Sequence, residues 1–147
     1  MRINPWILTL LAGAVVSLAA WTHFDAIQRF ERTITTTNIA LLRLESEIRL
    51  RSALDGHEMS RQGFVRLVDP DWFEGDPPQN QLLTGLNRRW IDVDTHADRS
   101  IRNPTTIFAT EGDAQWWYNP ANGVIRARVP GQPTIRATRE LYERVNR

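Results

Sequence analysis

Four side chains with metal-ligating atoms occur at every second position of one short segment: Asp92, Asp94, His96 and Asp98. Carboxylate oxygens at this spacing could hold calcium, which prefers hard oxygen ligands. The EF-hand pattern fails, because its glycine position is Ala97 and its final glutamate position is Asn103. On an extended segment the four residues would line one solvated face. We therefore predict no metal site, although the residues alone leave calcium binding by Asp92, Asp94 and Asp98 undecided.

The other residues that commonly do chemistry are sparse. His23, His57 and His96 have no ligand or triad spacing, and the chain has no cysteine. Disulfides, thiolate metal sites and cysteine nucleophiles are therefore excluded. The sequence contains no phosphate-binding loop, dinucleotide fingerprint or Gly-x-Ser-x-Gly motif. We predict no catalytic residue and no cofactor, and hence a protein that is not an enzyme.

The charge balance argues against nucleic acid as a partner. The 147 residues carry 18 basic and 17 acidic side chains, a formal net charge of +1. A nucleic-acid-binding domain typically carries a strong positive excess on one face or helix. All the basic residues are arginine, which we attribute to a GC-rich coding bias. A chain of this length has room for one modest domain beside an anchoring segment.

An apolar segment near the N-terminus predicts a membrane anchor over residues 1–24. No charged residue occurs from Trp6 to Trp21, and the stretch approaches the ~20 apolar residues that cross a bilayer core. The two tryptophans at its ends suit the headgroup region. Arg2 precedes the segment and Asp25 follows it. The positive-inside rule then predicts a single-pass inner-membrane protein with a cytoplasmic N-terminus and a periplasmic C-terminal domain.

Cleavage of this segment as a signal peptide is the alternative. Ser17-Leu18-Ala19 before Ala20 is an acceptable small-x-small cleavage site. We favour retention because the helical pattern runs on without a break past Trp21. Either outcome exports the rest of the chain.

The next segment, residues 25–56, is predicted to be one long amphipathic helix. It has no proline or glycine until Asp55-Gly56, a plausible stop. Apolar residues recur at alternating spacings of three and four, which is typical of one helix face. We identify this face, with Thr37 filling its gap, as the candidate assembly interface: Ile27, Phe30, Ile34, Leu41, Leu44 and Ile48. The same face could instead pack on the protein's own domain or pair as a coiled coil, and a long helix can do both along its length.

Residues 57–147 are predicted to form a small α+β domain. Trp116-Trp117-Tyr118 favours a strand, Asn122-Gly123 favours a turn, and the alternation from Val124 to Val129 favours a second strand with one buried face. A short strand is expected at Trp90–Val93 and a terminal helix at Thr138–Asn146. The aromatic run could stack on sugars, but packing in the core is the stronger expectation. The predicted fold is an N-terminal transmembrane helix that continues into a long amphipathic helix packed on a small antiparallel β-sheet.

This order of elements resembles the type IV pilin and type II secretion pseudopilin superfamily. The most specific segment runs from Trp116 through Tyr118-Asn119-Pro120 and Gly123 to Val129, and it is similar to a late hairpin in many pseudopilin-like proteins. The ending Leu141–Asn146 and the Pro-rich loop at Pro70–Asn80 are also similar. The prepilin cleavage motif is absent, because Met1–Trp6 leads into the apolar run with no glycine cleavage point and no intramembrane glutamate.

The resemblance implies an atypical, unprocessed subunit or accessory of a type II secretion or type IV pilus machine, acting by helix-mediated assembly. Its expected partners are the inner membrane, other pilin-like or secretion-system subunits and copies of itself, and not nucleic acid. The alternative is a bitopic envelope scaffold that dimerises through a coiled coil, for example in cell division or envelope maintenance. Which machine or partner it would join, and its oligomeric state, are beyond the residues alone.

Overall fold

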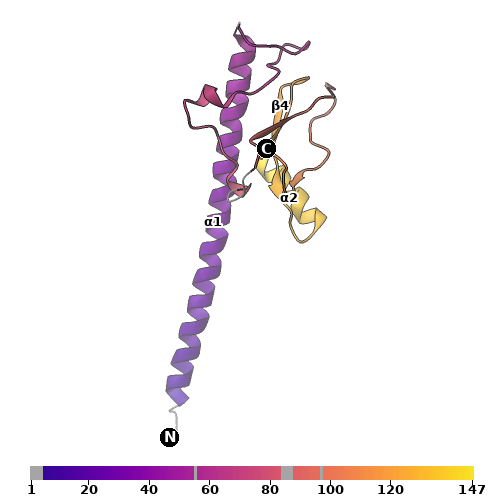
Figure 1. The fold of residues 1–147 in the computed structure, drawn as a ribbon. Coiled ribbons are helices and arrows are strands. Elements are labelled where there is room, and N and C mark those ends of the chain that lie inside the picture. The colour runs from indigo at the N-terminus through magenta and orange to yellow at the C-terminus, as the bar shows by residue number, and fades with distance from the viewer. Residues whose placement is uncertain (1–4, 55, 84–87, 97) are drawn as a thin grey trace. The chain divides into compact units, whose positions relative to one another are not determined.

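The computed structural model describes residues 5–54, 56–83, 88–96 and 98–147, with side chains from residue 21 onward. Contacts divide the chain into two compact units, Met1–Thr33 and Ile34–Arg147. The first unit is helical from Pro5. The second contains the rest of the same helix, the strands and the C-terminal helix (Figure 1).

The long helix predicted from the sequence is present as α1, which runs from Pro5 to Ala53. It continues through Thr35-Thr36-Thr37, although threonine has a low helix propensity. The predicted anchor begins at residues 1–4, which lie outside the described residues, as do its side chains up to residue 20. Within the described part of the chain, no helix is both long enough and apolar enough to span a bilayer.

The remaining elements are short. They are η1 (Pro70–Phe73), η2 (Gln81–Leu83), β1 (Ile91–Val93), β2 (Phe108–Ala109), β3 (Trp116–Asn119), β4 (Val124–Ala127), β5 (Val129–Pro130) and α2 (Ile135–Val145). The predicted terminal helix is thus confirmed, and it begins three residues earlier than expected. The Thr134 hydroxyl caps it by accepting from the Ala137 N–H at 3.1 Å.

The predicted β-hairpin is confirmed as β3 paired antiparallel with β4, in a register that places Asn119 opposite Val124. Gly123 in the turn has φ +70° and donates its N–H to the Asn119 carbonyl at 2.9 Å. A glycine suits this turn because the positive φ disfavours a side chain. The Phe64 ring also lies where a Cβ would stand, 2.3 Å from it.

The predicted antiparallel sheet is wrong in one respect, since the sheet is mixed. Its strand order is β1-β3-β4, and β1 runs parallel to β3 with Ile91 opposite Trp116. A second, two-stranded sheet pairs β2 parallel to β5. A parallel pair requires a long crossover connection, and here the chain between residues 93 and 116 supplies it.

The core of the second unit lies between α1, the three-stranded sheet and α2. Leu44 and Ile48 from α1, Trp116 and Ile125 from the hairpin, and Val145 from α2 are fully buried. The architecture is therefore α+β, with a long helix packed on a small mixed sheet. This arrangement fixes which side chains of α1 remain accessible.

Candidate functional site

Four of the six residues predicted to form the assembly interface are buried within the protein's own domain. Ile34 is 6% exposed, Leu41 is 1% exposed, and Leu44 and Ile48 are fully buried. All four belong to the hydrophobic core that includes Trp116 and Tyr142. These positions serve the fold, as in the alternative in which the stripe packs on its own domain.

The other two residues of the predicted interface are exposed. Ile27 is 48% exposed and Phe30 is 41% exposed. Both lie in the first unit, where Trp21 is 75% and Phe24 is 60% exposed. Four large apolar side chains are thus available for contact on the part of α1 that precedes the domain.

A second group of accessible apolar residues on α1 was missed in the sequence. Ile39, Leu42 and Leu50 are each more than half exposed. At about 100° per residue, they lie on the side of the helix away from Leu41 and Leu44. Their spacing of three and eight residues would also place them on one side of a helix. This second face was not identified from the sequence because the opposite face has more apolar residues at helical spacing.

The structure does not bring the candidate calcium ligands together. Asp92 pairs with Arg128 and with Arg89, the latter at 2.8 Å. Asp94 accepts from the His96 N–H at 2.8 Å, and Asp98 accepts from the Ser100 N–H and hydroxyl at 2.7 and 2.8 Å. The Ser100 hydrogen bonds also lower the pKa of Asp98. Among the described residues, no three acids or histidines are grouped so that they could hold a metal ion.

The aromatic run of the hairpin is part of the core. Trp116 and Tyr118 are fully buried and Trp117 is 5% exposed. The Tyr118 hydroxyl donates to the Val65 carbonyl at 2.7 Å, and burial raises its pKa. No ring face is left for a sugar, so the expectation of core packing is confirmed.

A buried arginine on the hairpin was also unexpected. The alternation from Val124 to Val129 places Arg128 opposite the expected buried face, yet only 8% of the residue is exposed. Its guanidinium pairs with Asp92 of β1 and lies 3.8 Å from Asp113. The ion pair links β1 to the residue that follows β4. The alternation of residues along one strand could not predict it, because Asp92 is distant in the sequence.

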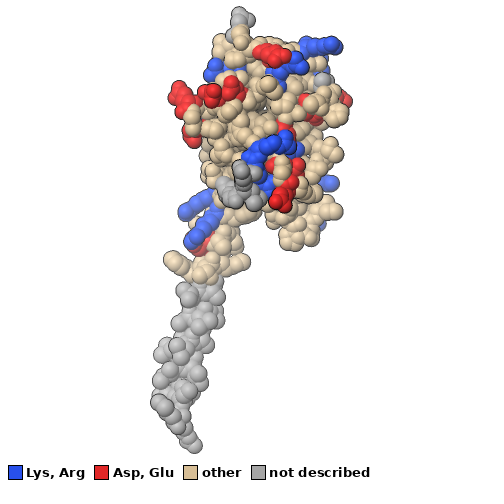
Figure 2. Space-filling view, in the orientation of Figure 1, with Lys and Arg blue, Asp and Glu red and all other residues tan. Residues whose placement is uncertain are grey.

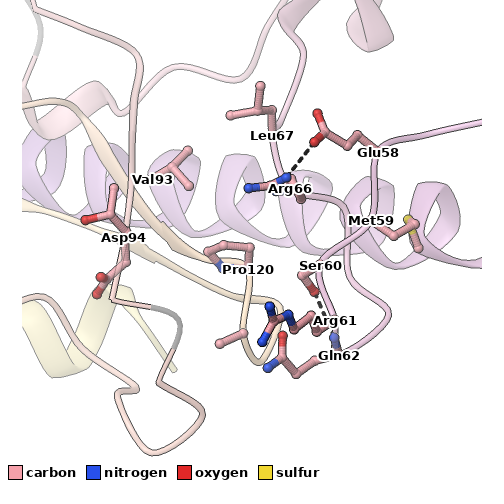
Figure 3. Close-up of a pocket in the computed structure, with 12 residues that line it drawn as sticks. Glu58, Met59, Ser60, Arg61, Gln62, Arg66, Leu67, Val93, Asp94 and Pro120 are labelled. Atoms are coloured by element: carbon pink, nitrogen blue, oxygen red, sulfur yellow. Dashed lines mark hydrogen bonds and ion pairs between the residues drawn. The ribbon is translucent and has the colours of Figure 1, made fainter.

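One open cleft of about 770 Å³ lies between the 58–67 segment, the end of β1 and the turn after β3. Glu58 and Arg66, two of its lining residues, form an ion pair with an N–O distance of 2.6 Å. Figure 3 marks this pair with a dashed line. Arg61 and Pro120 also line the cleft. The Ser60 hydroxyl accepts from the Gln62 and Phe64 N–H groups and so shapes the turn. The cleft therefore presents charges of both signs beside apolar side chains.

Comparisons with known proteins found no match. No protein family, no curated protein and no solved structure matches this chain. Most of the exposed large apolar side chains in the described part of the chain lie on α1, and we take them as the candidate functional surface.

Proposed function

We propose that this protein is a pilin-like or pseudopilin-like subunit, or an accessory, of a type II secretion or type IV pilus machine. The observation that carries the proposal is the exposure of Trp21, Phe24, Ile27 and Phe30 on α1 outside the domain. Large apolar side chains grouped on one segment are typical of surfaces that lipid or another protein covers. The family resemblance of the hairpin points to other pilin-like subunits as that protein.

In this proposal the domain and the first part of α1 have separate tasks. The apolar sequence before Trp21 anchors the chain in the inner membrane, and the side chains from Trp21 to Phe30 pack against neighbouring helices. The domain is built on the second half of α1, so its own core leaves the first half free for these contacts. The proposed action is assembly, with no chemical step.

Cysteine crosslinking in membranes tests the proposal directly, because the chain has no cysteine of its own. We would place single cysteines at Phe24, Ile27 and Phe30 and identify the adducts by mass. We expect adducts with pilin-like or secretion-system proteins at these positions. Arg32→Cys is the control, since Arg32 is exposed and lies on the opposite side of α1 from Phe30. Equal adducts at Arg32, or none at any position, would refute the proposal.

A bitopic envelope scaffold is the second candidate, and the exposed Ile39, Leu42 and Leu50 favour it. Two copies paired along this side of α1 would form a short coiled coil. Cysteine at Ile39 would then yield homodimers, with no adduct from the secretion or pilus proteins at Ile27. That result would replace the first proposal with the second.

A further inference from the structure

The open cleft of about 770 Å³ has the size and lining of a site for a small molecule. Ligand pockets in proteins enclose about 300–1,000 Å³ and combine an apolar lining with a few polar groups. Here the apolar part is supplied by Met59, Leu67, Val93, Pro120 and Ala121. Leu67 is 64% exposed, so its side chain is available to a ligand. The charged lining residues then decide which kind of ligand the cleft suits.

The four charged lining residues are not equally available to a ligand. They are Glu58, Arg61, Arg66 and Asp94. Glu58 and Arg66 form the ion pair with an N–O distance of 2.6 Å, so each largely neutralises the other. Arg61 is exposed and forms no ion pair within the described part of the chain. One positive charge therefore remains on the wall formed by the 58–67 segment.

The Asp94 carboxylate supplies a negative charge on the other wall, at the end of β1. Its side chain is 11% exposed. Only its Oδ1 is engaged among the described residues, because this oxygen accepts from the His96 N–H at 2.8 Å and lies 3.0 Å from the His96 ring Nδ1. Figure 3 shows Asp94 on one side of the cleft and Arg61 on the other. The cleft thus offers one available charge of each sign on separate walls.

The overall charge of the protein favours no ligand of one sign. The net charge is +1, and Figure 2 shows basic and acidic side chains close together on the visible face of the domain. Long-range attraction of a charged ligand requires a surface of one predominant sign. Recognition in the cleft therefore depends on Arg61 and Asp94, which together are complementary to a molecule with one negative and one positive end.

Val93 also presents backbone groups that the sheet does not use. Successive residues of a strand direct their N–H and C=O groups to opposite sides. The Asp94 N–H donates to the Tyr118 carbonyl of β3 at 2.8 Å, and β1 lies at the edge of the three-stranded sheet. The N–H and C=O of Val93 therefore face the open edge, where the peptide groups of an extended ligand can bond to them.

We propose that this cleft binds a short peptide with free ends, with the peptide carboxylate at Arg61 and the peptide ammonium at Asp94. A guanidinium pairs with a carboxylate through charge-assisted hydrogen bonds, and an ammonium supplies three donors to a carboxylate. Between the two ends, peptide groups bond to Val93 and an apolar side chain contacts Leu67. The lining includes no residue of α1, so this inference does not rest on the proposed assembly.

Calorimetric titration of the purified full-length protein in detergent tests the ligand class. The probe is the tripeptide alanyl-leucyl-alanine with free ends, and we expect it to bind saturably. Acetylation of its amino end should weaken binding by about tenfold, because Asp94 is nearly buried. Amidation of its carboxyl end should weaken binding by about threefold, because Arg61 is exposed and solvent screens its ion pair. No saturable binding up to about 10 mM, or equal binding of the free and the doubly capped peptide, would overturn the proposal.

Uncharged variants locate the two ends of the peptide. Asp94→Asn should abolish the preference for a free amino end and keep the preference for a free carboxyl end, and Arg61→Gln should do the reverse. Asparagine keeps an oxygen that can accept from the His96 N–H, so the local hydrogen bond is retained. Arg139→Gln is the matched control, since Arg139 is exposed and does not line this cleft. Unchanged preferences in both cleft variants, or an equal effect of the control, would contradict the assigned orientation.

The length of the ligand tests whether its two charges reach separate walls. Leucine, alanyl-leucine and alanyl-leucyl-alanine carry the same two end charges at increasing separation. We expect leucine to bind at least about tenfold more weakly than the better of the two peptides, because it cannot contact both charged side chains at once. Leucine that binds as tightly as the peptides would overturn the proposal of a peptide ligand.

Discussion

Two stretches of α1 carry apolar residues at helical spacing, and the two stretches differ in what covers them. From Ile34 to Ile48 the apolar face is buried by the sheet and α2, with Leu44 and Ile48 fully buried. From Trp21 to Phe30 the large apolar side chains are 41 to 75% exposed. An apolar helix face therefore indicates that something covers it, but it does not indicate whether the cover is the same chain or a partner.

The difference also separates stability from assembly. Removing a side chain from the buried stretch leaves a cavity in the domain core, which weakens folding. Removing one from the exposed stretch leaves the domain intact and affects only its contacts. Leu44→Ala and Ile27→Ala test this separation at its two ends, and Thr37→Val and Asp113→Asn test single polar groups of the domain. The expected effects on the free energy of unfolding decrease in the order in which the four substitutions follow.

The largest effect is expected for Leu44→Ala. Because Leu44 is fully buried, the change should lower the free energy of unfolding by about 2–5 kcal/mol. Urea unfolding of the full chain in detergent, followed by tryptophan fluorescence, measures it. Leu42→Ala is the matched control on the same helix, since Leu42 is 52% exposed. Equal losses from both variants would refute the assignment of the two helix faces.

A gain in stability is expected for Thr37→Val. Thr37 lies fully buried in the apolar face, and its hydroxyl has no hydrogen-bond partner in the described structure. An isosteric apolar side chain removes the unpaired hydroxyl, which should raise the free energy of unfolding by about 1 kcal/mol. The same urea titration applies. Thr36→Val, at an exposed position, should change little, and a clear loss in Thr37→Val would show that the hydroxyl does have a partner.

A smaller, pH-dependent effect is expected for Asp113→Asn. The Thr110 hydroxyl and N–H donate to the Asp113 carboxylate at 2.6 and 2.7 Å and lower its pKa below the ordinary value of 3.8. The unfolded chain then binds this proton more readily. The stabilisation is therefore present above the unfolded pKa and is lost as the pH falls through the folded one.

Asp113→Asn should flatten the loss of stability in the acid range, below about pH 4. Unfolding temperatures measured across this range in detergent would show it. Thr110→Val should give part of the same flattening, because it removes one of the two donors. A pH dependence that is unchanged in both variants would contradict the role of these hydrogen bonds.

The smallest effect on folding is expected for Ile27→Ala. Ile27 lies outside the domain and is 48% exposed, so the free energy of unfolding should change by less than about 0.5 kcal/mol. Crosslinking from a cysteine at Phe30 should nevertheless weaken in this variant if both side chains contact one partner. A folding loss comparable to that of Leu44→Ala would show that the domain itself covers Ile27.

Much of the fold could be predicted because local patterns control it. Absence of proline and glycine predicts the long helix, Asn122-Gly123 predicts the turn, and the alternation from Val124 to Val129 predicts a strand with a buried face. The parallel partner of β3 could not be predicted, since Ile91–Val93 and Trp116 are brought together across a long connection. Burial of Arg128 depends on the same pairing, because Asp92 of β1 is its partner.

The candidate interface on α1 could also be predicted only in part. The sequence by itself determined that α1 has an apolar face along its length, because 3.6 residues per turn place positions three and four apart on one side. Only the tertiary structure decided that Ile34, Leu41, Leu44 and Ile48 are covered while Ile27 and Phe30 are exposed. Burial depends on which distant segments pack against a face, and neither periodicity nor composition contains that information.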